Sequence, residues 1–169
     1  NLTKLKNSNM KNGKSVDDNL VSLIAKIGEK ITIGKTKTIE NANTQNFIYQ
    51  HSIIQDNVSK LGVVVSIETD QENNEINMFG KHLSMHIAAS NPISINSEDI
   101  DENILSKEKD LIFEELKNSG KTDEIIKKIS VGKINKFKDE NALISQDWVM
   151  EPKKKVKEIL TEMNIANLK

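Results

Sequence analysis

The sequence has no cysteine, two prolines and only 4% aromatic residues. Without cysteine, the chain can form neither a disulfide framework nor a thiolate zinc site, and it has no thiol nucleophile. It also lacks any apolar run near the ~20 residues that span a bilayer, and residues 1–14 contain no signal-peptide core. These absences predict a cytoplasmic protein with no membrane partner. Because aromatic residues are scarce, branched aliphatic residues must build the core.

The chain also lacks an excess of charge of either sign. Its 169 residues include 24 basic and 25 acidic residues. A balanced charge gives no long-range attraction to nucleic acid or anionic lipid, so we expect no direct nucleic-acid partner. A chain of this length can bury one domain core and a smaller appendage.

The beginning of the chain predicts a flexible tail followed by a helix. Residues 1–14 are rich in Asn and Lys, and such a composition cannot offset the entropy lost on ordering. Asp17 and Asp18 then favour the start of a helix, and apolar residues follow at helical spacing. These residues are Leu20, Leu23, Ile24 and Ile27. Gly28 is expected to end this short amphipathic helix.

The next part of the chain changes to an alternating pattern that is typical of strands. Alternation over residues 31–39, Phe47–Ile53 and Leu61–Ile67 predicts an antiparallel sheet of three strands. Over residues 75–90 the apolar positions again recur every three or four residues, up to Asn91 and Pro92. We therefore expect a helix there whose apolar side packs on the sheet.

From Ile100 to Phe137 the helical period continues, but charged residues occupy most faces. This pattern predicts an exposed, coiled-coil-like helical hairpin with its turn at 118–120, and with Thr122 capping the second helix. The apolar positions expected between the two helices are Leu105, Ile112 and Leu116 on the first, and Ile125, Ile126, Ile129 and Ile134 on the second.

Pro152 is expected to open a last amphipathic helix containing Val156 and Ile159. The order of elements predicts an α+β fold rather than an alternating parallel sheet. We expect the chain to consist of three parts. Residues 1–14 form a tail or linker, residues 15–99 with 139–169 form the core, and residues 100–138 form the inserted hairpin.

Two Gly-Lys-Thr triplets resemble the end of a phosphate-binding loop, at Gly34 and Gly120. That loop needs another glycine five residues earlier, where this chain has Glu29 and Glu115, and it needs a strand before and a helix after it. We therefore predict no nucleotide site. A nucleotide hydrolase that uses Gly34, Lys35 and Thr36 remains an alternative, and it would bind ATP or GTP.

Two histidines and one lysine cluster also have simple structural explanations. His82 and His86 are four residues apart, but a zinc site needs a third ligand, and a packed helix flank explains them better. The lysines between Lys153 and Lys157 have no aromatic residues among them for stacking on bases, which favours a solvated face. No serine nucleophile or paired carboxylates of a recognisable type occur. We predict no catalytic residue, metal or cofactor, so the residues alone indicate a binding module and not an enzyme.

Several segments resemble bacterial elongation factor Ts and occur in the same order as in that family. They are Ala25–Glu29, Tyr49–His51, Gly80–Pro92, Gly120–Lys121, Gly132–Phe137 and Trp148–Lys153. The resemblance extends from Asp17 to Met163. It implies the second half of the family's two-part core, with an antiparallel sheet and an inserted helical hairpin.

The resemblance also implies a function and three contact residues. Members of this family bind elongation factor Tu, with GDP bound or without nucleotide, and promote GDP release by disturbing its magnesium and phosphate environment. Ile27, Gly28 and His51 match family positions that contact the partner's nucleotide-binding domain. Without the resemblance, they would be interpreted as a core residue, a helix C-cap and a sheet-surface residue.

The chain departs from the family pattern at both ends. It lacks the amino-terminal domain and the Thr-Asp-Phe-Val motif, and at the corresponding place after Glu68 the residue Gln71 replaces the aromatic wedge. The strand expected after Asn164 is also lacking. We therefore expect a shortened chain that binds elongation factor Tu but exchanges nucleotide poorly. A scaffold whose hairpin docks another protein is the alternative, and homodimerisation of the chain stays open.

Overall fold

The computed structural model describes residues 1–39, 43–69, 73–117, 120, 122–165 and 167–168. The chain divides into two units, Asn1–Glu40 and Asn41–Lys169. Helices and an antiparallel sheet follow one another without βαβ alternation, so the predicted α+β class is confirmed. Our boundaries for tail, core and hairpin remain predictions. Asp70 and Gln71, at the place of the family's wedge, lie outside the described residues.

The first unit contains α1 (Leu2–Lys6) and α2 (Val16–Ile27). Ser15 caps α2, because its hydroxyl oxygen accepts a hydrogen bond from the Asp18 N–H at 3.0 Å. Gly28 ends the helix in the left-handed conformation, with φ of 79°. The predicted helix and its glycine stop are confirmed. Within the predicted tail, Lys6 forms a salt bridge with Asp17 at 2.9 Å.

The first of the three predicted strands is wrong. Residues 31–39 have no strand structure, and Gly34 therefore does not lie in a strand. Alternation alone cannot make a strand, because the backbone groups of a strand must pair with a neighbouring strand. Among the described residues, no strand pairs with this segment. Gly34 still lacks the strand and helix context of a phosphate-binding loop.

The sheet consists of two long strands, β1 (Thr44–Gln55) and β2 (Val58–Glu68), and a short one, β3 (Asn167–Leu168). Phe47 pairs with Val65 across the first two strands. Leu168 pairs with Ile67 at the other edge of β2, so the expectation of no strand after Asn164 is wrong. A strand of two residues carries no detectable alternation, and its position depends on β2.

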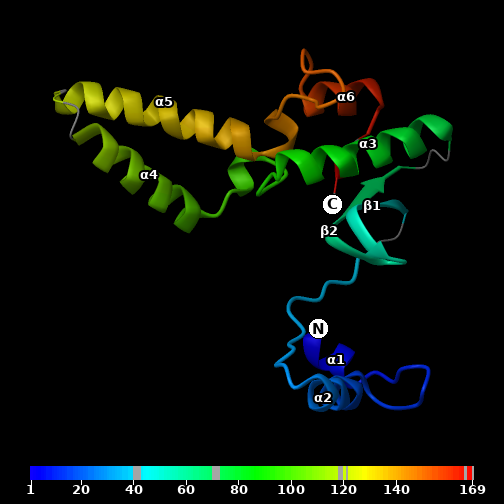
Figure 1. The fold of residues 1–169 in the computed structure, drawn as a ribbon. Coiled ribbons are helices and arrows are strands. Elements are labelled where there is room, and N and C mark those ends of the chain that lie inside the picture. Colours follow the sequence, from blue (N-terminus) through cyan, green and yellow to red (C-terminus); the bar gives the residue numbers. More distant parts are fainter. Residues whose placement is uncertain (40–42, 70–72, 118–119, 121, 166, 169) are drawn as a thin grey trace. The chain divides into compact units, whose positions relative to one another are not determined.

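The helix α3 (Asn74–Ser90) lies across this sheet, as predicted (Figure 1). Asn73 caps its start by accepting a hydrogen bond from the Ile76 N–H at 2.9 Å. Asn91 ends it in the left-handed conformation, with φ of 45°. The shared core contains these buried residues: Phe47, Val65, Ile67, Ile76, Phe79, Leu83, Leu143, Trp148, Val156 and Ile165.

The predicted helical hairpin is formed by α4 (Glu102–Lys117) and α5 (Asp123–Asn141), which lie side by side (Figure 1). Ile112, Leu116, Ile126 and Ile134 form its buried seam. Ile125 is wrong as a seam residue, since it is 47% exposed. It points about 100° away from Ile126 around the helix. Thr122 occupies the N-cap position, but its side chain makes no capping hydrogen bond.

A short 3₁₀ helix, η1 (Ser97–Asp99), lies between α3 and the hairpin. The chain returns from the hairpin to the core through a second one, η2 (Leu143–Ser145), which is followed by α6 (Val156–Glu162). The predicted start of α6 at Pro152 is wrong. The N–H of Lys155 donates to the Glu158 carboxylate at 2.7 Å, and the N–H of Glu158 donates to the Lys155 carbonyl at 3.0 Å, so the helix begins at Val156. No helix in the described part of the chain is both long and apolar enough to cross a membrane.

Candidate partner-binding surface

The first predicted contact site lies at the end of α2. No residue of α2 is buried, and Ile27 is 51% exposed at the last helical position. Val21 and Leu23 are also exposed apolar residues of the same helix. The Gly28 N–H donates to the Ile24 carbonyl at 2.8 Å, which fixes the backbone just after Ile27. This end of α2 thus presents an apolar side chain on a defined turn.

His51 lies on β1, opposite Leu61 of β2, and is exposed. Its Nδ1 lies 3.0 Å from the Tyr49 hydroxyl, which orients the imidazole and leaves Nε2 facing no hydrogen-bond partner among the described residues. Around it, the far end of the β1–β2 hairpin exposes several apolar residues. They are Ile53, Ile54, Val58 and Leu61. An exposed cluster of this kind is typical of a protein-binding surface.

The structure brings Ile27 and Gly28 together at one helix end in the first unit, and it places His51 in the second unit. Apolar residues near each site were not named from the sequence, notably Val21, Ile54 and Val58. The sequence does contain one signal of exposed apolar residues here, namely the adjacent pair Ile53 and Ile54. A strand with one covered face cannot bury two consecutive apolar side chains on that face.

His86 is buried with 0% exposure and stacks on Trp148, with ring centroids 5.3 Å apart. Its Nδ1 accepts a hydrogen bond from the Val149 N–H at 3.3 Å, so its Nε2–H donates to the Gln146 amide oxygen at 3.0 Å. Burial lowers the pKa of His86 below its ordinary value of 6.5, although the Gln146 hydrogen bond acts against this shift. Both ring nitrogens are used inside the protein, which fits a packed histidine rather than a metal ligand.

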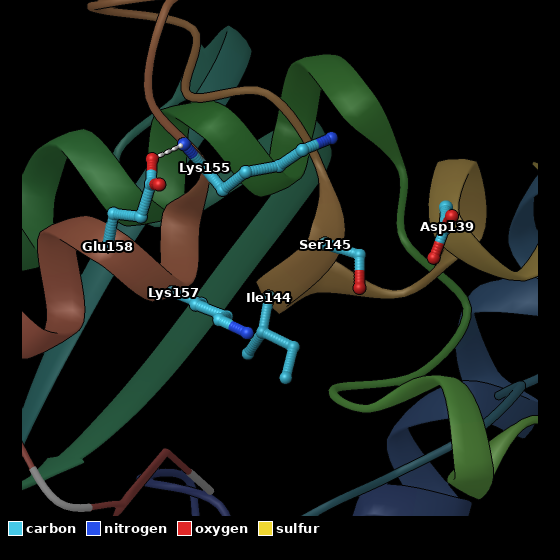
Figure 2. Close-up of a pocket in the computed structure, with 6 residues that line it drawn as sticks. All are labelled: Asp139, Ile144, Ser145, Lys155, Lys157 and Glu158. Carbon is cyan, nitrogen blue, oxygen red and sulfur yellow. Dashed lines mark hydrogen bonds between the residues drawn. The ribbon is translucent and has the colours of Figure 1, made fainter.

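A cavity of about 260 Å³ lies between the end of α5, η2 and α6. Figure 2 shows the residues that line it: Asp139, Ile144, Ser145, Lys155, Lys157 and Glu158. Two of its charged groups already have structural partners, since Lys155 pairs with Asp147 at 3.0 Å and Glu158 caps α6. Among the described residues, no group of three or more His, Cys, Asp or Glu side chains could hold a metal ion.

The lysine cluster before α6 is partly neutralised. Lys154 pairs with Glu162 at 2.9 Å and with Glu151 at 3.5 Å. Together with the Lys155–Asp147 pair, these contacts agree with a solvated face rather than with a site for polyanions.

The family model described as Elongation factor TS matches residues 1–169. The chain belongs to the elongation factor Ts family. Elongation factor Ts of Psychrobacter sp. (strain PRwf-1) is 41% identical over 149 residues, which cover 88% of this chain and 47% of the relative. Elongation factor Ts of Sinorhizobium medicae is 35% identical over 150 residues, covering 89% of this chain and 49% of the relative.

A more distant elongation factor Ts, from Orientia tsutsugamushi, is 30% identical over 164 residues, covering 95% of this chain and 52% of the relative. The chain thus spans about half the length of these curated relatives. Since the family is established, the exposed ends of α2 and of the β1–β2 hairpin are the surfaces on which an elongation factor Ts function can be tested.

Proposed function

We propose that this chain is part of a cytoplasmic guanine-nucleotide exchange factor that binds elongation factor Tu and promotes GDP release. The observation that carries the proposal is the family match over residues 1–169. Because the chain spans about half of its relatives, binding and exchange by the chain itself are separate questions. We expect it to bind both GDP-bound and nucleotide-free elongation factor Tu and to carry out no reaction of its own.

Exchange needs no catalytic residue in this chain. A protein that binds nucleotide-free elongation factor Tu more tightly than the GDP form must weaken GDP binding by the same factor, since the coupling is reciprocal. Ile27 would contribute apolar burial, Gly28 the fixed turn beside it, and His51 a hydrogen bond through Nε2. Their exposure of apolar and polar groups supports these roles.

The proposal is tested by two measurements on elongation factor Tu. Calorimetry measures binding of the chain, and release of a fluorescent GDP analogue measures exchange. We expect binding with weak stimulation, because Gln71 stands in place of the family's aromatic wedge. Absence of binding would contradict the proposal, whereas stimulation equal to that of a full-length relative would contradict only the expected weakness.

Variants assign the contact residues. Ile27→Ala and His51→Ala should each weaken binding of elongation factor Tu by about tenfold, the size of one contact worth ~1.4 kcal/mol. Ile125→Ala is the matched control, since Ile125 on α5 is 47% exposed and Ile27 is 51% exposed. An equal loss of affinity in all three variants would contradict a specific contact role for Ile27.

The nucleotide-hydrolase alternative predicts heat on titration of GTP or ATP into the chain alone, and loss of that heat in Lys35→Ala. We expect no such heat. Gly34 has neither the preceding strand nor the following helix that a phosphate-binding loop requires.

A further inference from the structure

A groove of about 410 Å³ runs along one face of the α4–α5 hairpin. Its size lies within the ~300–1,000 Å³ range of ligand pockets. The residues that line it are Lys109, Phe113, Lys127, Ser130, Val131, Ile134 and Asn135. None of these residues belongs to the predicted contact sites on α2 and β1.

The wall of the groove is apolar, and of its lining residues only Ile134 also belongs to the buried seam of the hairpin. Phe113 is 50% exposed and Val131 is 62% exposed, while Ile134 at the base is buried. The Ser130 hydroxyl donates a hydrogen bond to the Ile126 carbonyl at 2.9 Å, so this donor is already used within the backbone of α5. Phe113 and Val131 therefore offer apolar area that a bound side chain could cover.

The charged residues that line the groove have one sign. Its lining contains Lys109 and Lys127 and no carboxylate. Neither lysine forms an ion pair within the described part of the chain, although Asp123 and Glu124 lie one turn before Lys127. Elsewhere on the hairpin, by contrast, Lys133 pairs with Glu115 at 2.6 Å. The groove thus combines exposed apolar side chains with unpaired positive charge.

We infer that this groove binds an amphipathic helical segment of a partner protein, whose apolar side chains are flanked by acidic residues. The apolar residues of such a segment would cover Phe113 and Val131, as in helix-in-groove recognition. Its carboxylates would pair with Lys109 and Lys127 and set the specificity. A second copy of this face fits less well, because a two-fold contact would bring lysines against lysines.

The test uses the full chain and a fluorescein-labelled helical peptide with three leucines at positions i, i+4 and i+7, flanked by glutamates. A second peptide has lysines in place of the glutamates. Fluorescence anisotropy should show binding of the acidic peptide only. Val131→Glu, Lys109→Glu and Lys127→Glu should each raise its Kd at least about tenfold.

The chain offers matched controls for both kinds of variant. Leu111→Glu is the control for Val131→Glu, because Leu111 on α4 is 66% exposed and does not line the groove. Lys128→Glu is the control for the lysine variants, because Lys128 on α5 is exposed and does not line the groove either. Both should leave the Kd unchanged. Circular dichroism verifies that each variant folds, and Val131→Ala supplies a milder change that should weaken binding without adding charge.

Four results would overturn the inference. Equal binding of the acidic and basic peptides would contradict the role of the lysines in specificity. Equal effects of the groove and control variants would show that the peptide does not bind in the groove. Sedimentation showing self-association that Val131→Glu abolishes would assign the groove to a second copy. Tight binding of an RNA hairpin that Lys109→Glu abolishes would assign the lysines to phosphate. None of these readouts depends on elongation factor Tu.

Discussion

At the scale of single residues, Gly80 shows how one position fixes the approach of α3 to the sheet. A Cβ atom on Gly80 would overlap the ring of Phe47, which is buried and only 7% exposed. The absence of a side chain at this position therefore lets the helix lie against the aromatic ring, and the core between α3 and β1 depends on it.

Gly80→Ala should lower the free energy of unfolding by about 1–2 kcal/mol, because overpacking costs more than the ~1 kcal/mol that alanine gains over glycine in a helix. Gly132→Ala in α5 is the control. Apart from its two chain neighbours and the backbone of its own helix, no atom lies within 4 Å of a Cβ at Gly132, so this change should raise the free energy of unfolding by about 0.5–1 kcal/mol. Urea denaturation measures both, and a stabilising Gly80→Ala would show that the ring can move.

His86 gives the fold a dependence on pH. Its pKa in the folded chain is below 6.5, because burial disfavours the charged imidazolium. The unfolded chain therefore takes up a proton at a higher pH than the folded chain does. The stabilisation from neutral His86 is complete above pH 6.5 and is lost as the pH falls from 6.5 through the lower folded pKa.

We expect the free energy of unfolding to fall between pH 7.5 and pH 5.5, with a slope of at most ~1.4 kcal/mol per pH unit from one group. His86→Gln should reduce this slope, whatever its effect on stability at pH 7.5. His82→Gln, at the half-buried histidine one turn earlier, should retain the slope. Urea denaturation across this pH range provides the measurement, and an unchanged slope in His86→Gln would refute the assignment.

At the scale of elements, helix ends explain where sequence patterns succeed. Gly28 and Asn91 stop α2 and α3 in the left-handed conformation, and both stops were predictable from local residue preferences. The start of α6 was missed because Pro152 is a general signal, whereas the pairing of Lys155 with Glu158 decides the actual start. Residues 31–39 were wrongly predicted as a strand, since strand pairing depends on distant parts of the chain.

Two N-caps of α-helices differ in a way that can be measured. The Asn73 side chain accepts a hydrogen bond at the start of α3, but Thr122 makes no such bond at the start of α5. Asn73→Ala should therefore lower the free energy of unfolding by about 1 kcal/mol. Thr122→Ala should change it by less than about 0.5 kcal/mol. Thermal unfolding compares the two variants, and equal losses would mean that the Thr122 hydroxyl does cap α5 in solution.

At the scale of the whole molecule, the candidate sites depend on information of different kinds. Ile27, Gly28 and His51 were predictable only through the family resemblance, because each also has an ordinary structural role. The groove between Lys109 and Lys127 was not predictable, since it forms only when two helices pack in a particular register. Local patterns predict helices, but surfaces that combine two elements require the tertiary structure.

The two units should also differ in local stability, which connects the fold with the proposed function. The helix α2 has 12 residues and buries none of them, whereas α3 places Ile76, Phe79 and Leu83 in the core. A helix of ~12 residues without tertiary burial is marginally stable in water. In the free chain, amides of α2 should therefore exchange with deuterium much faster than those of α3.

Addition of elongation factor Tu should slow amide hydrogen exchange at the carboxyl end of α2 and around His51. Burial of Ile27 by the partner would raise the free energy of local unfolding of the helix. Amides of α5 around Ile125 should keep their rate, since that exposed isoleucine lies on the hairpin. Mass spectrometry of deuterium uptake, with and without the partner, measures all three segments. Protection confined to the hairpin would place the contact there and contradict the roles of Ile27 and His51, even if the two proteins bind.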